Sequence, residues 1–165
     1  MAYVKSSIPR PGDGAGCAAN RKSQIILIDV EDVESEPTRE VGNCVVTGNV
    51  TLKTGAKAIS IYATASTIQI TEELSGDPDA EGIKTGIVFD HPGNSVAIKN
   101  FIEVFKNRGV IAIVQECDGT DAGRPQIMGR VCNPLRLSLE TKMDGEATKR
   151  TLTWKQACPC LYLGS

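Results

Sequence analysis

The sequence predicts a mainly β (α+β) fold: an antiparallel β-sandwich or barrel of about nine strands with one flanking helix and a C-terminal β-hairpin. Short apolar or alternating runs, bounded by turn-forming residues, recur along the chain. Only the stretch NSVAIKNFIEVFKNRG has the three- and four-residue apolar spacing of a helix, predicted at about residues 94–108. The hairpin is predicted at about residues 134–156.

The length of 165 residues is enough for one ordinary core but not for two comfortable domains. Residues 1–22 are rich in Gly, Pro, Ala and Ser and lack periodicity, so we expect a flexible N-terminal arm. Residues 23–165 are expected to form a single domain.

The overall composition, 41% hydrophobic and 23% charged, is that of a globular protein. Aromatic residues make up 4% and the net charge is −2, which argues against base-stacking platforms and against tight wrapping of a phosphate backbone. No apolar run approaches the length of a membrane span, and no apolar region follows the early lysine. We therefore expect no signal peptide and no membrane anchor.

The predicted helix has an apolar stripe that should plug the open face or end of the β-structure. Asn94 or Ser95 can cap its first N–H groups, and Gly109 can adopt the left-handed conformation that ends a helix. The residues of the stripe, at helical spacing, are Val96, Ala97, Phe101, Val104 and Phe105.

Three strand segments carry specific expectations. The unbroken aliphatic run in Ser23–Val30 indicates burial on both faces or in a subunit interface. The long alternating run Ala58–Glu73 changes phase, which predicts a bulge or bend near residues 64–67. Gly129, within the strand predicted at Gln126–Cys132, indicates a bulge or a close approach of the backbone.

The C-terminal hairpin is predicted in register as well as in place. A two-residue turn at Asp144-Gly145 would set Glu140 opposite Lys149, Leu137 opposite Leu152 and Leu135 opposite Trp154. The residues predicted to pack in the core are Phe101, Phe105, Leu135, Leu137, Leu152 and Trp154.

An acidic segment follows the first strand and is closed by Pro37. Such a charge run is usually a solvated loop. The alternative is a loop that presents negative charge to a partner or a channel. Its candidate contact residues are Glu31, Asp32, Glu34 and Glu36.

The sequence contains no motif for nucleophilic, nucleotide-dependent or zinc-dependent catalysis. His91, the single histidine, is expected to be a loop residue beside Pro92 and Gly93. The cysteines form no CxxC pair, and we expect Cys44, Cys117 and Cys132 to be small buried residues in strands. We predict no enzyme activity, no catalytic or metal-binding residues and no cofactor.

The segment IKTGIVFDHPGNSVAIKNFIEVFKNRGVIAIVQEC, a strand–helix–strand unit, is followed by IMGRVCNPLRLS and by a hairpin ending in TLTWK. In this order the chain resembles the tail tube (major tail) protein of long-tailed bacteriophages, which is related in fold to the type VI secretion tube protein. The resemblance covers about residues 23–163 in topology.

This resemblance implies a structural virion protein made in the bacterial cytoplasm. Its copies would form rings, hexameric in the family, that stack into a tube through which DNA passes without tight binding. Other tail proteins would be its partners, and the acidic segment and the N-terminal arm would be candidates for inter-ring or lumen contacts. No catalytic or metal residue comes with the family.

Three alternatives remain open from the sequence. The chain could be another tail subunit, either a terminator or a baseplate hub, which would share the fold and differ in stacking. It could be a stand-alone β-sandwich module for binding or adhesion. It could also be a small enzyme using His91 and an unpaired cysteine.

Overall fold

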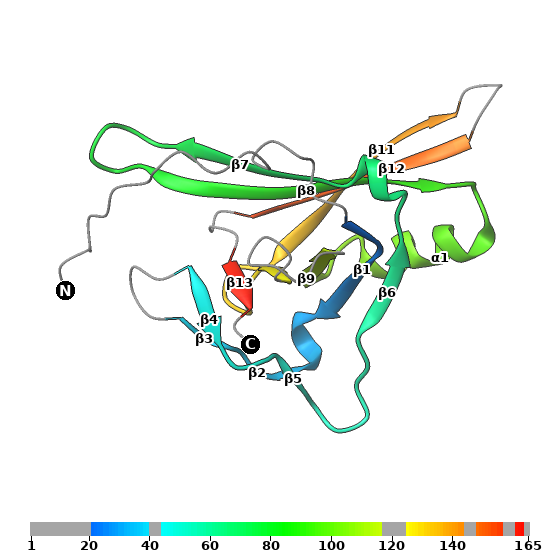
Figure 1. The fold of residues 1–165 in the computed structure, drawn as a ribbon. Coiled ribbons are helices and arrows are strands. Elements are labelled where there is room, and N and C mark those ends of the chain that lie inside the picture. The colour runs from blue at the N-terminus through cyan, green and yellow to red at the C-terminus, as the bar shows by residue number, and fades with distance from the viewer. Residues whose placement is uncertain (1–20, 40–43, 117–124, 144–147, 157–160, 164–165) are drawn as a thin grey trace, which may run out of the picture.

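A computed structural model describes residues 21–39, 44–116, 125–143, 148–156 and 161–163. They contain thirteen strands, one α-helix and two short 3-10 helices, which confirms the mainly β prediction (Figure 1). The strands are β1 (Arg21–Asp29), β2 (Val33–Ser35), β3 (Thr38–Arg39), β4 (Val45–Thr47), β5 (Thr51–Leu52), β6 (Ile59–Tyr62), β7 (Gln69–Ser75), β8 (Gly82–Pro92), β9 (Gly109–Glu116), β10 (Gln126–Met128), β11 (Leu135–Met143), β12 (Thr148–Gln156) and β13 (Leu161–Leu163). The helices are η1 (Val30–Asp32), η2 (Ala65–Thr67) and α1 (Val96–Phe105).

The larger sheet curls around one core, with β9 at its centre. On one side β9 pairs with β1, which pairs with β6; on the other it pairs with β11, followed by β12, β8 and β7. The curl closes where the end of β6 meets the end of β8. There the N–H of Thr64 donates to the carbonyl of Asp90 at 3.1 Å, and His91 Nδ1 lies 2.9 Å from the carbonyl oxygen of Tyr62. A few polar contacts, rather than a full ladder, thus complete the barrel.

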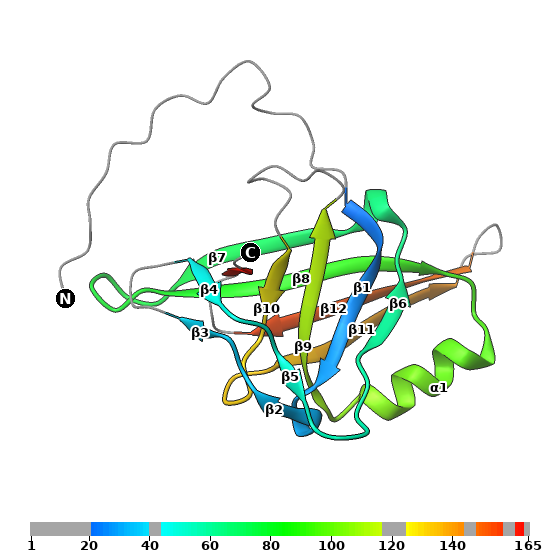
Figure 2. The ribbon, with the colours of Figure 1, turned by 60° about the horizontal axis from the view of Figure 1, so that its bottom comes forward.

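Strand β1 is buried on both faces within this one chain. Ile25 and Leu27 face the barrel core, while Ile28 belongs to a second apolar cluster on the outer side. The second cluster also contains side chains of β9, β10 and β4 and of the separate pair β2–β5. Figure 2 shows β10, β9, β1 and β6 side by side in this order. The aliphatic run therefore needs no subunit interface to explain it.

Helix α1 lies across one end of the barrel, as the plug prediction requires, but with a different stripe (Figure 2). The side chains that face the core are Ile98, Phe101, Ile102 and Phe105. Val96 and Val104 from the predicted stripe are 73% and 56% exposed. The helix offers two overlapping apolar stripes, and the barrel end selects the one at i, i+3, i+4 and i+7.

The start of the helix follows the prediction, and its end does not. Ser95 Oγ accepts a hydrogen bond from the N–H of Ile98, which is an N-cap. At the other end the cap is Lys106 in right-handed helical conformation. Gly109 instead begins β9, where an added Cβ would lie 2.5 Å from the Pro134 side chain. Close packing, rather than helix termination, therefore requires glycine at this position.

The predicted hairpin forms, with its register shifted by two residues. Leu137 lies opposite Trp154, Leu139 opposite Leu152, and Glu140 opposite Thr151. Leu135 pairs with Val110 of β9. The last pair is Met143 with Thr148, so the connection spans residues 144–147, and the predicted turn at Asp144-Gly145 lies outside the described residues. A shift of two keeps each side chain on its predicted face, because the strand period is two.

The predicted bend and the predicted close approach are both confirmed. Between β6 and β7 the chain turns through η2, within the range where the alternation changes phase. Gly129 has φ of +97°, and an added Cβ would lie 2.8 Å from the carbonyl oxygen of Val110. Only glycine meets both conditions without strain.

Other local expectations change. Cys44 and Cys132 are exposed rather than buried, since both lie outside the strands, and Cys117 is outside the described residues. Strand β1 begins at Arg21, inside the range 1–22 assigned to the N-terminal arm, and residues 1–20 are not described. No helix in the described part of the chain is long and apolar enough to cross a bilayer.

Candidate functional site

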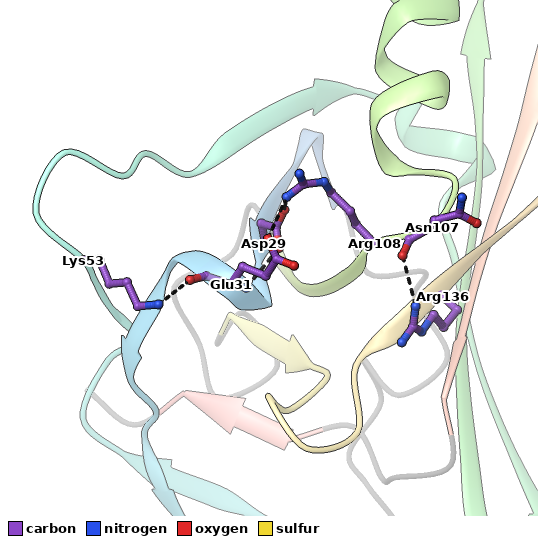
Figure 3. A network of polar contacts seen from close by, with 6 residues as sticks. All are labelled: Asp29, Glu31, Lys53, Asn107, Arg108 and Arg136. Atoms are coloured by element: carbon purple, nitrogen blue, oxygen red, sulfur yellow. Dashed lines mark hydrogen bonds and ion pairs between the residues drawn. The ribbon is translucent and has the colours of Figure 1, made fainter.

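The acidic segment folds into defined structure. Asp29, at the end of β1, caps η1 by accepting a hydrogen bond from the N–H of Glu31 at 3.0 Å. Its other carboxylate oxygen accepts from Arg108 Nη1 at 2.6 Å, and Glu31 accepts from the same nitrogen at 3.1 Å (Figure 3). One guanidinium, placed just after α1, therefore joins two carboxylates of the segment.

This arrangement acts on the titration of Arg108. The pKa of Arg108 lies above its ordinary value, chiefly because of the hydrogen bond to Asp29 and then because of the charges of Asp29 and Glu31. A raised pKa of a base means that its contribution to stability is present at neutral pH and is lost only as pH rises through that pKa. Arg108 is therefore a permanent cation under ordinary conditions.

Neighbouring contacts extend the network to two more elements. Lys53 Nζ donates to the carbonyl of Glu31 at 2.6 Å, and Lys53 N–H donates to the carbonyl of Asp32 at 2.9 Å. Arg136, at the start of β11, donates to the carbonyl of Asn107 at 3.2 Å (Figure 3). The acidic segment, the end of α1 and the base of the hairpin are thus held together by polar contacts.

Glu36 is also engaged within the chain. It accepts a hydrogen bond from the N–H of Val131, and its second oxygen lies 3.9 Å from Arg130 Nη1. Within the described ranges, the side chains of Asp32 and Glu34 make no hydrogen bond or ion pair, although the charge of Asp32 also acts on Arg108, and Glu34 is exposed. Of the four predicted contact residues, Glu34 is thus the best placed to meet another molecule. The predicted contact with a neighbouring ring stays a prediction.

The six residues predicted to pack in the core lie together in or against the barrel core. Phe105, Leu135, Leu152 and Trp154 are buried, while Phe101 and Leu137 are half-buried against them. The Phe105 ring lies between the other two rings, with centroid distances of 4.7 Å to Phe101 and 6.5 Å to Trp154. These side chains join α1 to the hairpin.

Among the described residues the larger sheet ends at β3, β6 and β7, and the edges of β7 and β6 are the longer ones. At the first, β7 pairs only with β8, and the two strands form a ribbon, residues 69–88, whose tip extends beyond the barrel because β12 pairs with β8 only over Thr85–Pro92 (Figure 1). Near its tip Leu74 pairs with Ile83, and both are exposed, Leu74 at 68%. A long open edge with apolar side chains favours pairing with another strand.

At the other open edge, β6 pairs only with β1 until it meets β8. Between β6 and α1 lies a groove of about 270 Å³. It is lined by Ser60, Ile61, Tyr62, His91, Ser95, Ala97, Ile98 and Phe101.

His91 belongs to β8 rather than to a loop, because pairing with β12 continues to Pro92. Its Nδ1 must carry the hydrogen, since the Tyr62 carbonyl can only accept. The side chain thus helps to close the barrel. Within the described part of the chain no three His, Cys, Asp or Glu side chains form a group that could hold a metal ion.

Sequence reasoning did not find the groove or the ribbon edge. The groove joins residues about 30 positions apart through the closure of the barrel, and no local pattern reports such a contact. The sequence indicated the ribbon only in part, through the polar, turn-rich loop between two alternating strands.

No protein family model, curated protein or solved structure matches this chain.

Proposed function

We propose that this chain is a structural subunit that assembles with copies of itself into stacked rings of a phage-type tail tube through which DNA passes. The observation that carries the proposal is the β7–β8 ribbon, which extends beyond the barrel with one open edge and the exposed pair Leu74 and Ile83. In a chain that remains monomeric, such an edge leaves backbone groups unpaired and favours aggregation. In a subunit that assembles, the same groups can pair with a neighbouring copy.

Two further features support the proposal. The strand–helix–strand order around α1, followed by a long hairpin, is the layout on which the resemblance to tail tube proteins rests. The net charge of −2 suits a tube that lets DNA slide, because a basic channel would hold phosphate. In this proposal the ring is a hexamer, the protein resides in the virion, other tail proteins are its partners, and it has no catalytic activity.

Light scattering after size-exclusion chromatography, followed by negative-stain microscopy, tests the proposal. We expect rings or filaments of uniform width, with assembly rising with protein concentration. Closed rings that never stack would favour the terminator or hub alternative. A chain that stays monomeric up to about 1 mM, a concentration at which even weak association is measurable, would refute self-assembly.

A further inference from the structure

We propose that the open edge of β6, in the groove beside α1, binds the β7 edge of a second copy of this chain, so that copies join head to tail. This inference rests on the self-association proposed above and names the two surfaces that would make it. It assigns the occupant of the groove as the ribbon of the neighbouring copy.

The backbone of β6 points hydrogen-bonding groups into the groove. In an antiparallel pair the N–H and C=O of successive residues face alternate sides of the strand. Ala63 N–H faces β1, where it donates to Ser23, and the carbonyl of Tyr62 faces the opposite side, toward His91. The N–H and C=O of Ser60 and the N–H of Tyr62 therefore also face away from β1, with no backbone partner among the described residues.

The same alternation identifies the outward groups of β7. The N–H and C=O of Asp90 in β8 both point to the side of η2 and β7, since they bond to Thr67 Oγ1 and Thr64 N–H. Val88 is two residues from Asp90, so its backbone N–H and C=O also point toward β7, where Val88 lies opposite Gln69. The intervening β7 residues, Ile70 and Leu74 among them, then direct their backbone groups to the open side. Each edge thus supplies the donors and acceptors that the other needs.

Charge and apolar character are also complementary between the two ends. Residues 69–85 hold five carboxylates and one lysine, a net −4. Residues 53–62 and 94–108, which carry the groove, hold four lysines and one arginine against one glutamate, a net +4. Lys106 pairs with Glu103, and Arg108 pairs with Asp29 and Glu31, whose two negative charges reduce the net charge of this end from +4 to +2. Lys57 and Lys99 contribute to this remaining positive charge. Exposed apolar side chains are present on both sides, with Leu74 on the ribbon and Ile59 and Tyr62 on β6.

The placement of the two surfaces determines the form of the assembly. The tip of the ribbon and α1 lie at opposite ends of the molecule in both views (Figures 1 and 2). When two different surfaces of identical chains bind each other, an open row of copies has a free groove at one end and a free ribbon edge at the other. It therefore continues until it closes into a ring or extends as a filament.

The test uses proline to remove an outward N–H from either edge. Ser60→Pro affects the groove and Leu74→Pro affects the ribbon, and neither N–H takes part in the strand's own ladder, so both variants should fold. Ser60→Ala and Leu74→Ala are the controls, because they alter the same side chains but keep the N–H. Far-UV circular dichroism and thermal unfolding check that the fold is kept.

We expect each proline variant to raise the protein concentration at half-assembly by at least about tenfold. Each alanine control should raise that concentration by a factor several times smaller. Mixing the two proline variants should give dimers that do not grow, since Ser60→Pro retains a ribbon and Leu74→Pro retains a groove. A Lys57→Glu, Lys99→Glu double variant should also weaken assembly, with a smaller salt dependence.

A Ser60→Pro variant that folds and assembles like the unaltered chain would overturn the inference while leaving self-assembly intact. Mixed proline variants that stay monomeric would overturn it as well. If a proline variant fails to fold, the lysine double variant decides, and unchanged assembly there counts against the groove. An unaltered chain that stays monomeric at all concentrations would refute the proposed function and this contact together.

Discussion

Replacing Phe105 by alanine tests whether α1 is held by the barrel of its own chain. Phe105 is 3% exposed and packs against Phe101 and Trp154. Loss of a buried phenylalanine side chain costs about 3–5 kcal/mol in transfer and cavity free energy. Since a domain has about 5–15 kcal/mol of stability in total, the change should remove a large share of it.

Urea unfolding followed by the fluorescence of Trp154 measures this cost. Trp154 is the single tryptophan and is fully buried, so its emission should move to longer wavelength on unfolding. Val104→Ala is the matched control, because Val104 is on the same helix and 56% exposed, and we expect a change within about 0.5 kcal/mol. If Phe105→Ala is too unstable to purify, Phe105→Leu should still show a loss of about 1–2 kcal/mol.

Two outcomes would contradict the packing of α1 against the barrel of its own chain. A Phe105→Ala cost below about 1 kcal/mol, or one equal to that of Val104→Ala, would mean that the helix does not plug the barrel in the isolated subunit. A loss that appears only in assembled material would place the stabilising contact with a neighbouring copy instead.

Local geometry leads to three more predictions. Gly129→Ala should destabilise the chain by about 2–4 kcal/mol in urea unfolding, whereas Gly48→Ala should cost about 1 kcal/mol, because both have positive φ but only the first new Cβ meets backbone; equal costs would refute the clash. Arg108→Gln should lower stability more at low than at high salt, since it removes the positive charge whose Nη1 contacts the carboxylates of both Asp29 and Glu31, and a salt-independent loss would contradict this. Trp154→Phe should cost less in urea unfolding, followed for this variant by circular dichroism, than Phe105→Ala, because Trp154 Nε1 is buried with no hydrogen-bond partner among the described residues and its removal relieves that penalty; a larger cost would point to an unrecognised partner.

Much of the fold could be predicted from local pattern. Strand alternation, the single helical spacing and turn residues identified most of the longer strands, the helix and the hairpin, because these signals arise from residues close in sequence. Gly129 was correctly interpreted, since a glycine within a strand pattern typically marks a bulge or a close approach of backbone. The short elements η1, β2 and β3 were missed because an acidic run with few apolar residues carries no period.

Choices between equivalent patterns depended on tertiary contacts. The helix offers two apolar stripes of similar width, and packing against the barrel core, including the contact of Phe105 with Trp154, decides which one is buried. The predicted hairpin register differs from the observed one by two residues. Both registers put the same side chains inward, so alternation alone cannot distinguish them. Gly109, the first residue of β9, fits a helix cap in sequence, but its neighbour in space is Pro134.

The sequence by itself thus determined a mainly β fold with one helix, since periodicity and composition are properties of the chain alone. Only the tertiary structure decided the closure of β6 against β8, the pairing of the acidic segment with Arg108, and the placement of α1 and the tip of the ribbon at opposite ends of the molecule. These features join residues far apart along the chain, and their free energy comes from contacts that exist only once the barrel has formed.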